Sequence, residues 1–337
     1  MSVWFAVALL AAALAVWFLL ELGRRRTHPV TPGLHEEIVL PHEAEWELWH
    51  NDFSLCSKKI RVCLAELGID YVAHHVDLIE TGCYGVLDPA FLRINPAATV
   101  PVLVHRGHPV YESHEQIRYA AGFAGHGVSL VPQDAAERAE MERWVDLGAL
   151  LGDDPMSDLE RSAGNCVPGL TLPLFAAMNA HIPWRRFLVG VLFHRLRMRP
   201  LGMMLMKVRG VARLLDIPPL AGAMRRSFAM LGTHLDTLEA ALAERGGPWI
   251  LGAQFTLADA GIMVVLDRLA EGGWAQALLA GRPHVAAYWN ALQARDSFRV
   301  ALDGHRHPTV ERGMADLARL RAESPRFAAA LAGDFGT

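Results

Sequence analysis

One stretch decides the fold of this 337-residue chain: Asn51-Asp52-Phe53-Ser54-Leu55-Cys56-Ser57-Lys58-Lys59-Ile60-Arg61. A short apolar and aromatic strand, Trp46 to His50, precedes it, and a helix is predicted from about Cys56 to Leu67, where Gly68 ends it. A cysteine placed where a strand turns into a helix faces unpaired backbone N–H groups and the positive end of the helix dipole. Both favour the thiolate over the thiol, so Cys56 is a candidate reactive cysteine.

The sequence around this stretch has the pattern of an α/β domain over residues 46–124. Further strands are predicted at Tyr71 to Val76, Val100 to His105 and Pro109 to Tyr111, with Gly107 in the last turn. Further helices are predicted at Pro89 to Ile94 and from Ser113 to about Phe123. The predicted order is therefore strand, helix, strand, helix, two strands and a helix.

Four short motifs follow one another within this domain. They are Ser54-Leu55-Cys56-Ser57, Asn95-Pro96, Val100-Pro101-Val102-Leu103 and Glu112-Ser113. In this order and at this spacing they resemble the thioredoxin-like domain of glutathione S-transferases, and the zeta and beta classes are the closest in pattern. The resemblance implies a glutathione-binding thioredoxin-like domain followed by an all-α domain, with glutathione as a substrate.

The resemblance also assigns roles to single residues. Pro101 resembles the family's cis-proline, which leaves the backbone of Val100 free to pair with the peptide part of glutathione. A cis peptide bond is almost exclusively a property of proline, so residue and role agree. Glu112 and Ser113 occupy the positions that hold the γ-glutamyl end of glutathione. Ser113 begins a helix, so it also suits a cap at a helix N-terminus that receives a carboxylate.

One position departs from the family pattern. Members often carry a basic or amide side chain just before the Val-Pro pair, where it reaches the glycine end of glutathione. Here that place reads Ala97-Ala98-Thr99. We expect Thr99 and Lys59 to contribute to glutathione binding, and Lys58 and Arg61 are further candidates for the missing basic group. Simple solvation of these helical side chains is the alternative.

Ser54 and Cys56 are competing catalytic residues. In zeta-like enzymes a serine at the Ser54 position donates a hydrogen bond to the glutathione thiolate, whereas in beta-like enzymes a cysteine matching Cys56 forms a mixed disulfide with glutathione. A donor stabilises a bound anion, but a cysteine of low pKa is itself the nucleophile. A third interpretation makes Cys56 a small, partly buried residue without chemistry. Cys63, further along the same helix, is expected in the core.

The N-terminus predicts a membrane anchor. Every residue from Val3 to Leu20 is apolar, and roughly twenty such residues cross a bilayer. Three arginines, residues 24–26, follow the run and no basic residue precedes it, so the positive-inside rule places the soluble domains on the cytoplasmic side. A cleaved signal peptide is the alternative. We predict a single-pass transmembrane helix over residues 1–23, in contact with the membrane through residues 3–22, and a proline-containing linker over residues 24–45.

The rest of the chain predicts an all-α domain over residues 125–325 and a tail over residues 326–337. Helices are predicted at Ala135 to Leu151, about Ala221 to Arg245, Leu257 to Ala270, His284 to Ala294 and Val310 to Ala322. Thr256 and Asp259 have the spacing of a capping box, with Asp in place of Glu or Gln. The resemblance makes Asp259 structural rather than catalytic.

Residues 152–217 form an insertion that the usual family pattern lacks. It contains Pro168, Pro173, Pro183 and Pro200, and apolar pieces such as Phe187 to Phe193 with basic residues on both sides. This composition suits the surface of an anionic leaflet. A helical insertion that packs on the protein, with solvated arginines, is the alternative. In architecture, a long insertion at this place resembles the ganglioside-induced differentiation-associated branch, which is membrane-anchored at its C-terminal end.

Composition excludes several classes of protein. A net charge of −4 and a pI near 6.5 give no reason to expect nucleic-acid binding. Four irregularly spaced cysteines suit a reducing compartment better than a disulfide framework. None of the sixteen histidines belongs to a recognisable zinc motif, so no metal is expected.

Two hypotheses about function follow. In the first, the chain is a membrane-anchored glutathione S-transferase that conjugates glutathione to an apolar electrophile or carries out glutathione-dependent thiol/disulfide reduction. In the second, it is a non-catalytic module of the same fold that binds partners or organises a membrane. The joint presence of Ser54, Cys56, Pro101, Glu112 and Ser113 favours the enzyme. The family commonly dimerises, so a homodimer is a candidate assembly unless the insertion blocks that interface.

Overall fold

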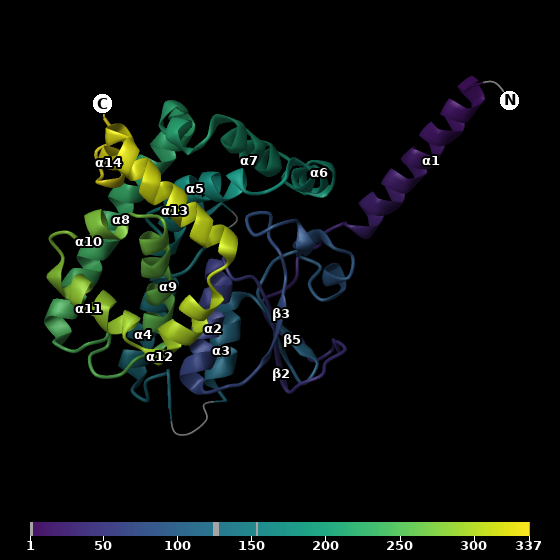
Figure 1. The fold of residues 1–337 in the computed structure, drawn as a ribbon. Helices are drawn as coiled ribbons and strands as arrows, with labels where there is room; N and C mark the ends of the chain where they lie inside the picture. The colour runs from purple at the N-terminus through teal and green to yellow at the C-terminus, as the bar shows by residue number, and fades with distance from the viewer. Residues whose placement is uncertain (1–2, 124–127, 153, 337) are drawn as a thin grey trace.

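The computed structural model describes residues 3–123, 128–152 and 154–336. It has three parts: a projecting N-terminal helix, α1 (Val3–Arg24), a small β-sheet with two helices against it, and a larger helical part (Figure 1). Helix α2 (Leu55–Leu67) lies between the sheet and the helical part, and it packs against α9 (Leu257–Glu271) and α12 (Asp296–Ala301). Residues 51–61, which include the first turns of α2, therefore lie where the sheet and the helical part meet.

Five strands form one sheet in the order β1-β5-β4-β2-β3. Their bounds are β1 Gly33–Leu34, β2 Trp46–His50, β3 Val72–His75, β4 Val102–His105 and β5 His108–Tyr111. β2 and β3 are parallel neighbours that α2 connects in sequence. The other neighbouring strands are antiparallel. With α3 (Ser113–Ala121), this order agrees with the predicted strands and helices. The edge strand β1 was not predicted.

Local sequence signals explain both ends of α2. Ser54 has an extended backbone and its side chain accepts a hydrogen bond from the backbone N–H of Ser57, which caps the first turn. Gly68 ends the helix at φ 65°, a left-handed conformation that glycine adopts without a steric penalty. The predicted bounds of this helix are thus confirmed to within a residue.

The helix predicted from Pro89 to Ile94 is only a single 3₁₀ turn, Phe91–Arg93. Asn95 and Pro96 follow it, and the residue before a proline is disfavoured in the helical conformation. The side chain of Asn95 instead bonds to the carbonyl of Thr99 at 2.8 Å. The segment is therefore a series of turns that leads into the Val100–Pro101 peptide.

The segment expected to be a linker, residues 24–45, is packed on the sheet rather than free. β1 pairs with β5, the N–H of His28 donates to the carbonyl of Pro96, and the N–H of Leu40 donates to the carbonyl of Gly107. Leu40 itself is buried. The prolines that suggested a tether are compatible with these turns, because an edge strand with few ladder bonds tolerates them.

The helical part follows α3. Besides α9 and α12, it contains α4 (Ala135–Leu147), α5 (Ala163–Ala180), α6 (Trp184–Phe193), α7 (Met198–Arg209), α8 (Pro218–Arg245), α10 (Ala275–Leu279), α11 (Pro283–Gln293), α13 (Pro308–Glu323) and α14 (Pro325–Leu331). Helix α9 is the centre of this part, since nearly all its residues are buried. The predicted capping box at Thr256 and Asp259 begins it, with both arms formed.

The insertion over residues 152–217 divides into two structures. Its first helix, α5, belongs to the core and contains the fully buried Leu174 and Met178. Its second half, α6 and α7, lies at the edge of the helical part nearest the foot of α1 (Figure 1). These two helices bury Phe187, Met203 and Met206. They and the loop between them also expose large apolar side chains, namely Trp184, Leu188, Leu192, Leu196, Met198, Leu201, Leu205 and Val208.

The C-terminal segment also differs from expectation. Residues 326–337 were expected to form a tail, but α14 covers most of the described part of this segment and buries Phe327 and Leu331. Ser324 caps the helix by accepting a hydrogen bond from the N–H of Phe327. A short, alanine-rich helix has little periodicity of its own, so its packing decides its structure.

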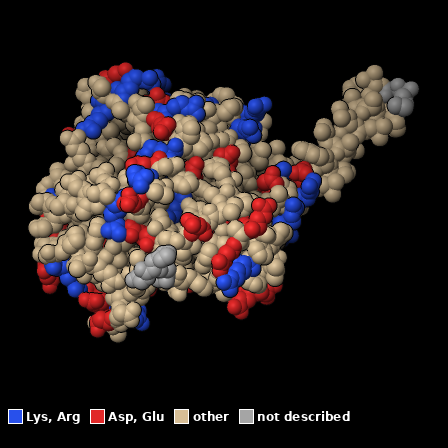
Figure 2. Space-filling model, turned by 60° about the horizontal axis from the view of Figure 1, so that its bottom comes forward, with Lys and Arg blue, Asp and Glu red and all other residues tan. Residues whose placement is uncertain are grey.

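Helix α1 is the one described helix that is long and apolar enough to cross a membrane, on length and composition alone. None of its residues is buried, and its charged residues gather at its foot (Figure 2). There Phe18 stacks on Phe193 of α6, with ring centroids 5.8 Å apart, and Arg25 donates from Nη1 to the carbonyl of Leu87 at 2.8 Å. The foot of α1 therefore contacts both other parts of the molecule.

Candidate active site

The first turn of α2, the Val100–Pro101 peptide and the start of α3 lie side by side. The Val100–Pro101 bond is cis, as predicted. Gln116 of α3 donates from Nε2 to the carbonyl of Pro101 at 2.9 Å, which fixes the start of α3 beside this peptide. Nζ of Lys59 on α2 lies 3.1 Å from Nε2 of His114 on α3. The motifs quoted from the sequence thus converge on one corner of the sheet.

Three of the predicted glutathione contacts border this corner. Ser113 is the first residue of α3 and is buried, whereas Glu112 just before it holds the N-cap position and is exposed at φ 67°. No side chain caps this helix from the N-cap position, so the prediction that Ser113 is its cap is wrong. A positive φ is uncommon for a residue other than glycine and is found preferentially at ligand sites. Thr99 is exposed and its hydroxyl lies 3.0 Å from Nδ2 of Asn95. The unpaired N–H groups of the first turn of α3 suit a carboxylate.

Ser54 and Cys56 differ in what they face. Ser54 is half-buried and lines an apolar cavity of about 620 Å³ between the two parts of the molecule. Cys56 is also half-buried, but it is not among the residues that line this cavity. Cys63 is fully buried, and burial raises the pKa of its thiol, as its predicted place in the core implies. A sulfur atom beside Ser54 would therefore face the cavity directly.

The basic side chains of α2 point inward rather than toward solvent. Lys58, Lys59 and Arg61 are at most 2% exposed, so solvation does not account for them. Burial lowers the pKa of the Lys59 ammonium, and burial together with Lys59 lowers the pKa of His114 to about 3. His114 is therefore neutral and accepts the hydrogen bond from Lys59. Lys59 is therefore held against His114 at the start of α3, and its predicted role in glutathione binding stays a prediction.

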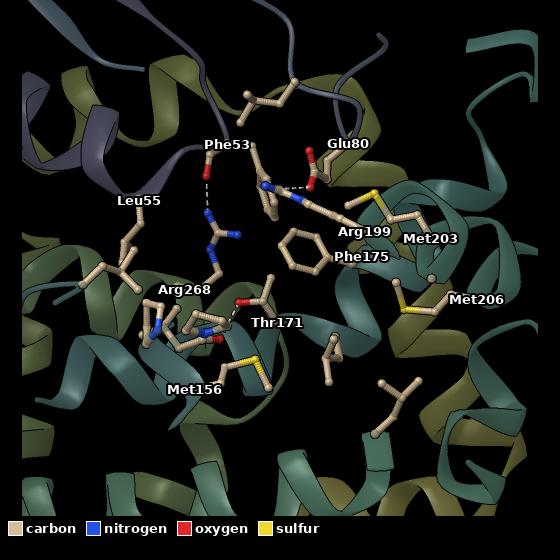
Figure 3. A pocket seen from close by; sticks show the side chains of 18 of the residues that line it. Phe53, Leu55, Glu80, Met156, Thr171, Phe175, Arg199, Met203, Met206 and Arg268 are labelled. Carbon is tan, nitrogen blue, oxygen red and sulfur yellow. Dashed lines mark hydrogen bonds and ion pairs between the residues drawn. The ribbon is translucent and has the colours of Figure 1, made fainter. Parts of the chain in front are cut away.

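The cavity beside Ser54 is lined mainly by apolar side chains, among them Phe53, Phe175, Met203 and Met206. Figure 3 shows Arg268 of α9 and Arg199 of α7 among these side chains, with Glu80 paired to Arg199. Nη2 of Arg199 lies 3.1 Å from Oε1 of Glu80. Large apolar pockets with a few convergent polar groups are the usual sites for small ligands.

A buried ion cluster joins α2 to α9 beneath this cavity. Lys58 lies 2.5 Å from Oδ2 of Asp267 and 2.7 Å from Oε1 of Glu271, and Arg306 contacts the same two carboxylates. Burial opposes ionisation of Asp267, but Lys58 and Arg306 outweigh it and leave the pKa of this carboxyl below its usual range. Sequence analysis missed the cluster, because residues more than 200 positions apart supply its charges.

Histidines and aspartates also meet between the two parts. Candidate metal-ligand atoms of His50, Asp52 and His305 lie within 4.8 Å of one another, and so do those of His75, Asp77 and His307. The Arg61 guanidinium lies 3.1 Å from Nδ1 of His50, and Nδ1 of His307 caps α13 by accepting from Thr309. Each group thus has an internal role that competes with a cation. The sequence spacing could not reveal either group.

Comparisons with known proteins identify the class. Family models described as the N-terminal and C-terminal domains of glutathione S-transferase match residues 53–121 and 221–291. Glutathione S-transferase TCHQD of Arabidopsis thaliana is 30% identical over 273 residues, which are 75% of this chain and 88% of that protein. The chain therefore belongs to the glutathione S-transferase family, with a thioredoxin-like N-terminal domain and a helical C-terminal domain.

Two further likenesses bear on the reaction and on the fold. The 2,5-dichlorohydroquinone reductive dechlorinase of Sphingobium indicum is 25% identical over 322 residues, which are 81% of this chain and 88% of the relative. The crystal structure of beta-etherase LigF from Sphingobium sp. strain SYK-6 aligns with a TM-score of 0.61 and 20% identity, over 77% of this chain and 100% of that one. The chain is thus similar to glutathione-dependent enzymes of transferase and reductase type, and the family's thiol substrate is glutathione.

Proposed function

We propose that this protein is a membrane-anchored glutathione transferase that joins glutathione to an apolar electrophile. The observation that carries the proposal is the position of Ser54, which caps the N-terminus of α2 and also lines the apolar cavity. Glutathione bound against Val100 and Ser113 would present its sulfur at Ser54. An apolar second substrate in the cavity would then meet the sulfur without crossing water.

In this proposal each site residue has one task. The backbone of Val100 pairs with the peptide part of glutathione, and Glu112 and Ser113 hold the γ-glutamyl end with the N-terminus of α3. Thr99 offers a hydroxyl near the glycine end, and Lys59 supplies positive charge. The Ser54 hydroxyl donates a hydrogen bond to the thiolate and lowers the pKa of the thiol, because hydrogen bonding to a charged form favours that form.

Glutathione-dependent thiol/disulfide reduction is the second candidate reaction, and the position of Cys56 in the first turn of α2 favours it. The Cys56 sulfur would attack one sulfur of a substrate disulfide, form a mixed disulfide and release the other half as a thiol. Glutathione would then attack the mixed disulfide and restore Cys56. The two reactions need different residues, so variants of Ser54 and Cys56 separate them. A non-catalytic module of the same fold would need neither residue, and the absence of a basic side chain at Ala98-Thr99 is what favours that alternative.

We also propose that α1 crosses the membrane once, with both soluble domains on the cytoplasmic side. The apolar length of α1, its exposed surface and the arginines at its foot support this topology. The exposed apolar and basic residues of α6 and α7 lie at the same edge of the molecule and suit the surface of an anionic leaflet. Because α7 also lines the cavity, an apolar substrate has a short path from the bilayer to Ser54.

Calorimetric titration of glutathione into the full-length protein in detergent micelles tests the proposal. We expect saturable binding that Ser113→Ala weakens by about tenfold or more, because a hydrogen bond to a charged group contributes about 1.5–3 kcal/mol. Ser324→Ala is the control, since it also removes a serine hydroxyl at a helix N-terminus, in this case the N-cap of α14. Absence of binding at millimolar glutathione, or equal weakening by both variants, would contradict the proposed site.

A further inference from the structure

An open pocket of about 610 Å³ lies where the foot of α1 meets the loop between α6 and α7. Its walls come from two stretches that are far apart in the chain, residues 19–27 and residues 193–197. The stacked rings of Phe18 and Phe193 hold these stretches together, and Figure 1 shows the foot of α1 beside α6. The apolar cavity beside Ser54 shares no lining residue with this pocket, so the two are separate sites.

One side of the pocket is strongly basic. No carboxylate lines it, but four arginines do: Arg25, Arg26, Arg195 and Arg197. Arg25 is already engaged, because Nε donates to Glu21 and Nη1 donates to the carbonyl of Leu87, both at 2.8 Å. The side chains of the other three form no ion pair or hydrogen bond with any residue that the structure describes. Three guanidinium groups around one pocket are therefore free to bind an anion.

The carboxylates near the pocket do not neutralise these three arginines. Glu80 pairs with Arg199 at 3.1 Å, and the Asp88 carboxylate accepts from the backbone N–H of Ala90 at 2.7 Å. His194 adds no charge at neutral pH, because burial and the nearby Arg199 lower its pKa. At this corner six arginines meet three carboxylates, namely Arg24, Arg25, Arg26, Arg195, Arg197 and Arg199 with Glu21, Glu80 and Asp88. Three positive charges remain without a counter-ion.

The other side of the pocket is apolar. Leu19 and Leu22 of α1 and Phe193 of α6 line it. This wall continues into the exposed apolar surface of α1 and into Leu188 and Leu192 on α6. Leu22 is the last apolar side chain of α1 before the arginines, so the pocket lies at the level where hydrocarbon gives way to lipid headgroups. A ligand with an anion at one end and hydrocarbon at the other matches both walls.

Resting on the proposed membrane crossing of α1, we propose that this pocket binds one anionic phospholipid of the cytoplasmic leaflet. The phosphate lies among the guanidinium groups of Arg26, Arg195 and Arg197, and the acyl chains lie along the apolar wall. A planar guanidinium suits this ligand, because it donates two parallel hydrogen bonds to a phosphate. Arg197 also holds the N-cap position of α7, a helix without a side-chain cap, so the positive end of the helix dipole faces the same pocket.

A lipid in this pocket does more than a charged surface that attracts a leaflet. It has a stoichiometry of one, and its affinity depends on particular arginines rather than on net charge. It also joins the anchor α1 to the start of α7, a helix that lines the cavity beside Ser54. The lipid therefore fixes the orientation of the soluble domains at the membrane.

Native mass spectrometry of the full-length protein in uncharged detergent micelles tests the proposal by counting bound lipids. Phosphatidylglycerol and phosphatidylcholine with identical acyl chains are supplied in equal amounts. We expect one bound phosphatidylglycerol, preferred about tenfold or more, because each arginine near an anionic lipid changes the affinity about fivefold. Arg195→Gln/Arg197→Gln should weaken its binding about twentyfold. Equal binding of both lipids by the wild type, or an unchanged preference in the double variant, would overturn the proposal.

Arg185→Gln/Arg186→Gln is the matched control, because it removes two charges from α6 that do not line the pocket. This variant should keep the preference, and an equal loss would show attraction to net charge alone. Glycerol 3-phosphate in an amount equal to the lipid should not displace it; displacement would overturn the lipid assignment in favour of a soluble phosphate.

The premises of the proposal are measured separately. Protease protection in sealed vesicles reports whether α1 crosses the membrane, and calorimetry reports glutathione binding. The lipid count in micelles requires neither result. An integral membrane protein that binds glutathione but shows no lipid preference would refute this inference alone, so its failure is distinguishable from failure of the proposed function.

Discussion

Replacing Asp259 by alanine tests how the capping box holds the centre of the helical domain. The Asp259 carboxylate is fully buried and accepts four hydrogen bonds. Oδ1 accepts from the N–H of Ile250 at 3.0 Å and from the hydroxyl of Tyr288 at 2.9 Å, and Oδ2 accepts from the N–H and the hydroxyl of Thr256 at 2.8 and 3.1 Å. One side chain therefore ties the start of α9 to a preceding turn and to α11.

The expected loss of stability is a balance of two effects. Alanine leaves four buried donors unpaired, the N–H groups of Ile250 and Thr256 and the hydroxyls of Thr256 and Tyr288, at about 1–3 kcal/mol each. It also removes a buried carboxylate whose pKa is raised by burial from 3.8 to about 6 despite these hydrogen bonds, which relieves about 3 kcal/mol at pH 7. At about 2 kcal/mol for each donor, the balance is a net loss of about 5 kcal/mol in the free energy of unfolding.

Urea unfolding of the full-length protein in micelles at pH 7, followed by tryptophan fluorescence, measures this loss. Trp249 is a suitable reporter because its ring centroid lies 6.3 Å from that of Tyr288. Asp259→Asn keeps the shape and one acceptor oxygen, so it should lose less than Asp259→Ala. A loss below about 1 kcal/mol for Asp259→Ala, or equal losses for both variants, would refute the reasoning.

The same residue predicts a dependence on pH with a definite sign. Because the pKa of Asp259 is raised in the folded protein, its contribution to stability is present at low pH and is lost as pH rises from about 4 through about 6. The wild type should therefore lose stability relative to Asp259→Asn as pH rises over this interval. Above it, the difference in free energy of unfolding between the two proteins should stay constant. A difference that widens with pH would show that the carboxylate is stabilised rather than strained by its site.

Three further predictions concern other parts of the chain. Gly190→Ala should loosen α6 and increase its cleavage in limited proteolysis, because a Cβ there would overlap the ring and the hydroxyl of Tyr84; unchanged cleavage would contradict this packing. A thiol reagent should label Cys56 in the native protein and Cys63 only after unfolding, as mass spectrometry of labelled peptides would show, and native labelling of Cys63 would contradict its burial. Deleting residues 1–26 should release the protein from membranes in a carbonate wash while glutathione binding persists; continued sedimentation with membranes would point to an additional anchor.

The sequence predicted most of the elements around the candidate site. Ser54, Gly68 and the Val100–Pro101 pair each act through local backbone conformation or capping, and such effects depend on neighbouring residues alone. The sequence also predicted the order of β2, α2 and β3 correctly. The roles of the site residues in glutathione binding stay predictions.

What the sequence could not predict depends on distant contacts. Lys58 looked like a solvated helical residue, yet its partners Asp267 and Glu271 lie more than 200 positions away. Residues 24–45 looked like a tether because of their prolines. The strand β1, which pairs with β5, has two residues and is too short to show an alternating apolar pattern. Arg268 gave no signal within its helix, and only the folded chain places it beside Ser54.

The most direct test of the account is the ionisation of bound glutathione. Difference absorbance of the thiolate against pH, recorded with the wild type, Ser54→Ala and Cys56→Ala, measures the pKa of the bound thiol. The account predicts a lowered pKa in the wild type, a return toward the value of free glutathione in Ser54→Ala, and no change in Cys56→Ala. A lowered pKa that survives in Ser54→Ala and is lost in Cys56→Ala would contradict the role of Ser54.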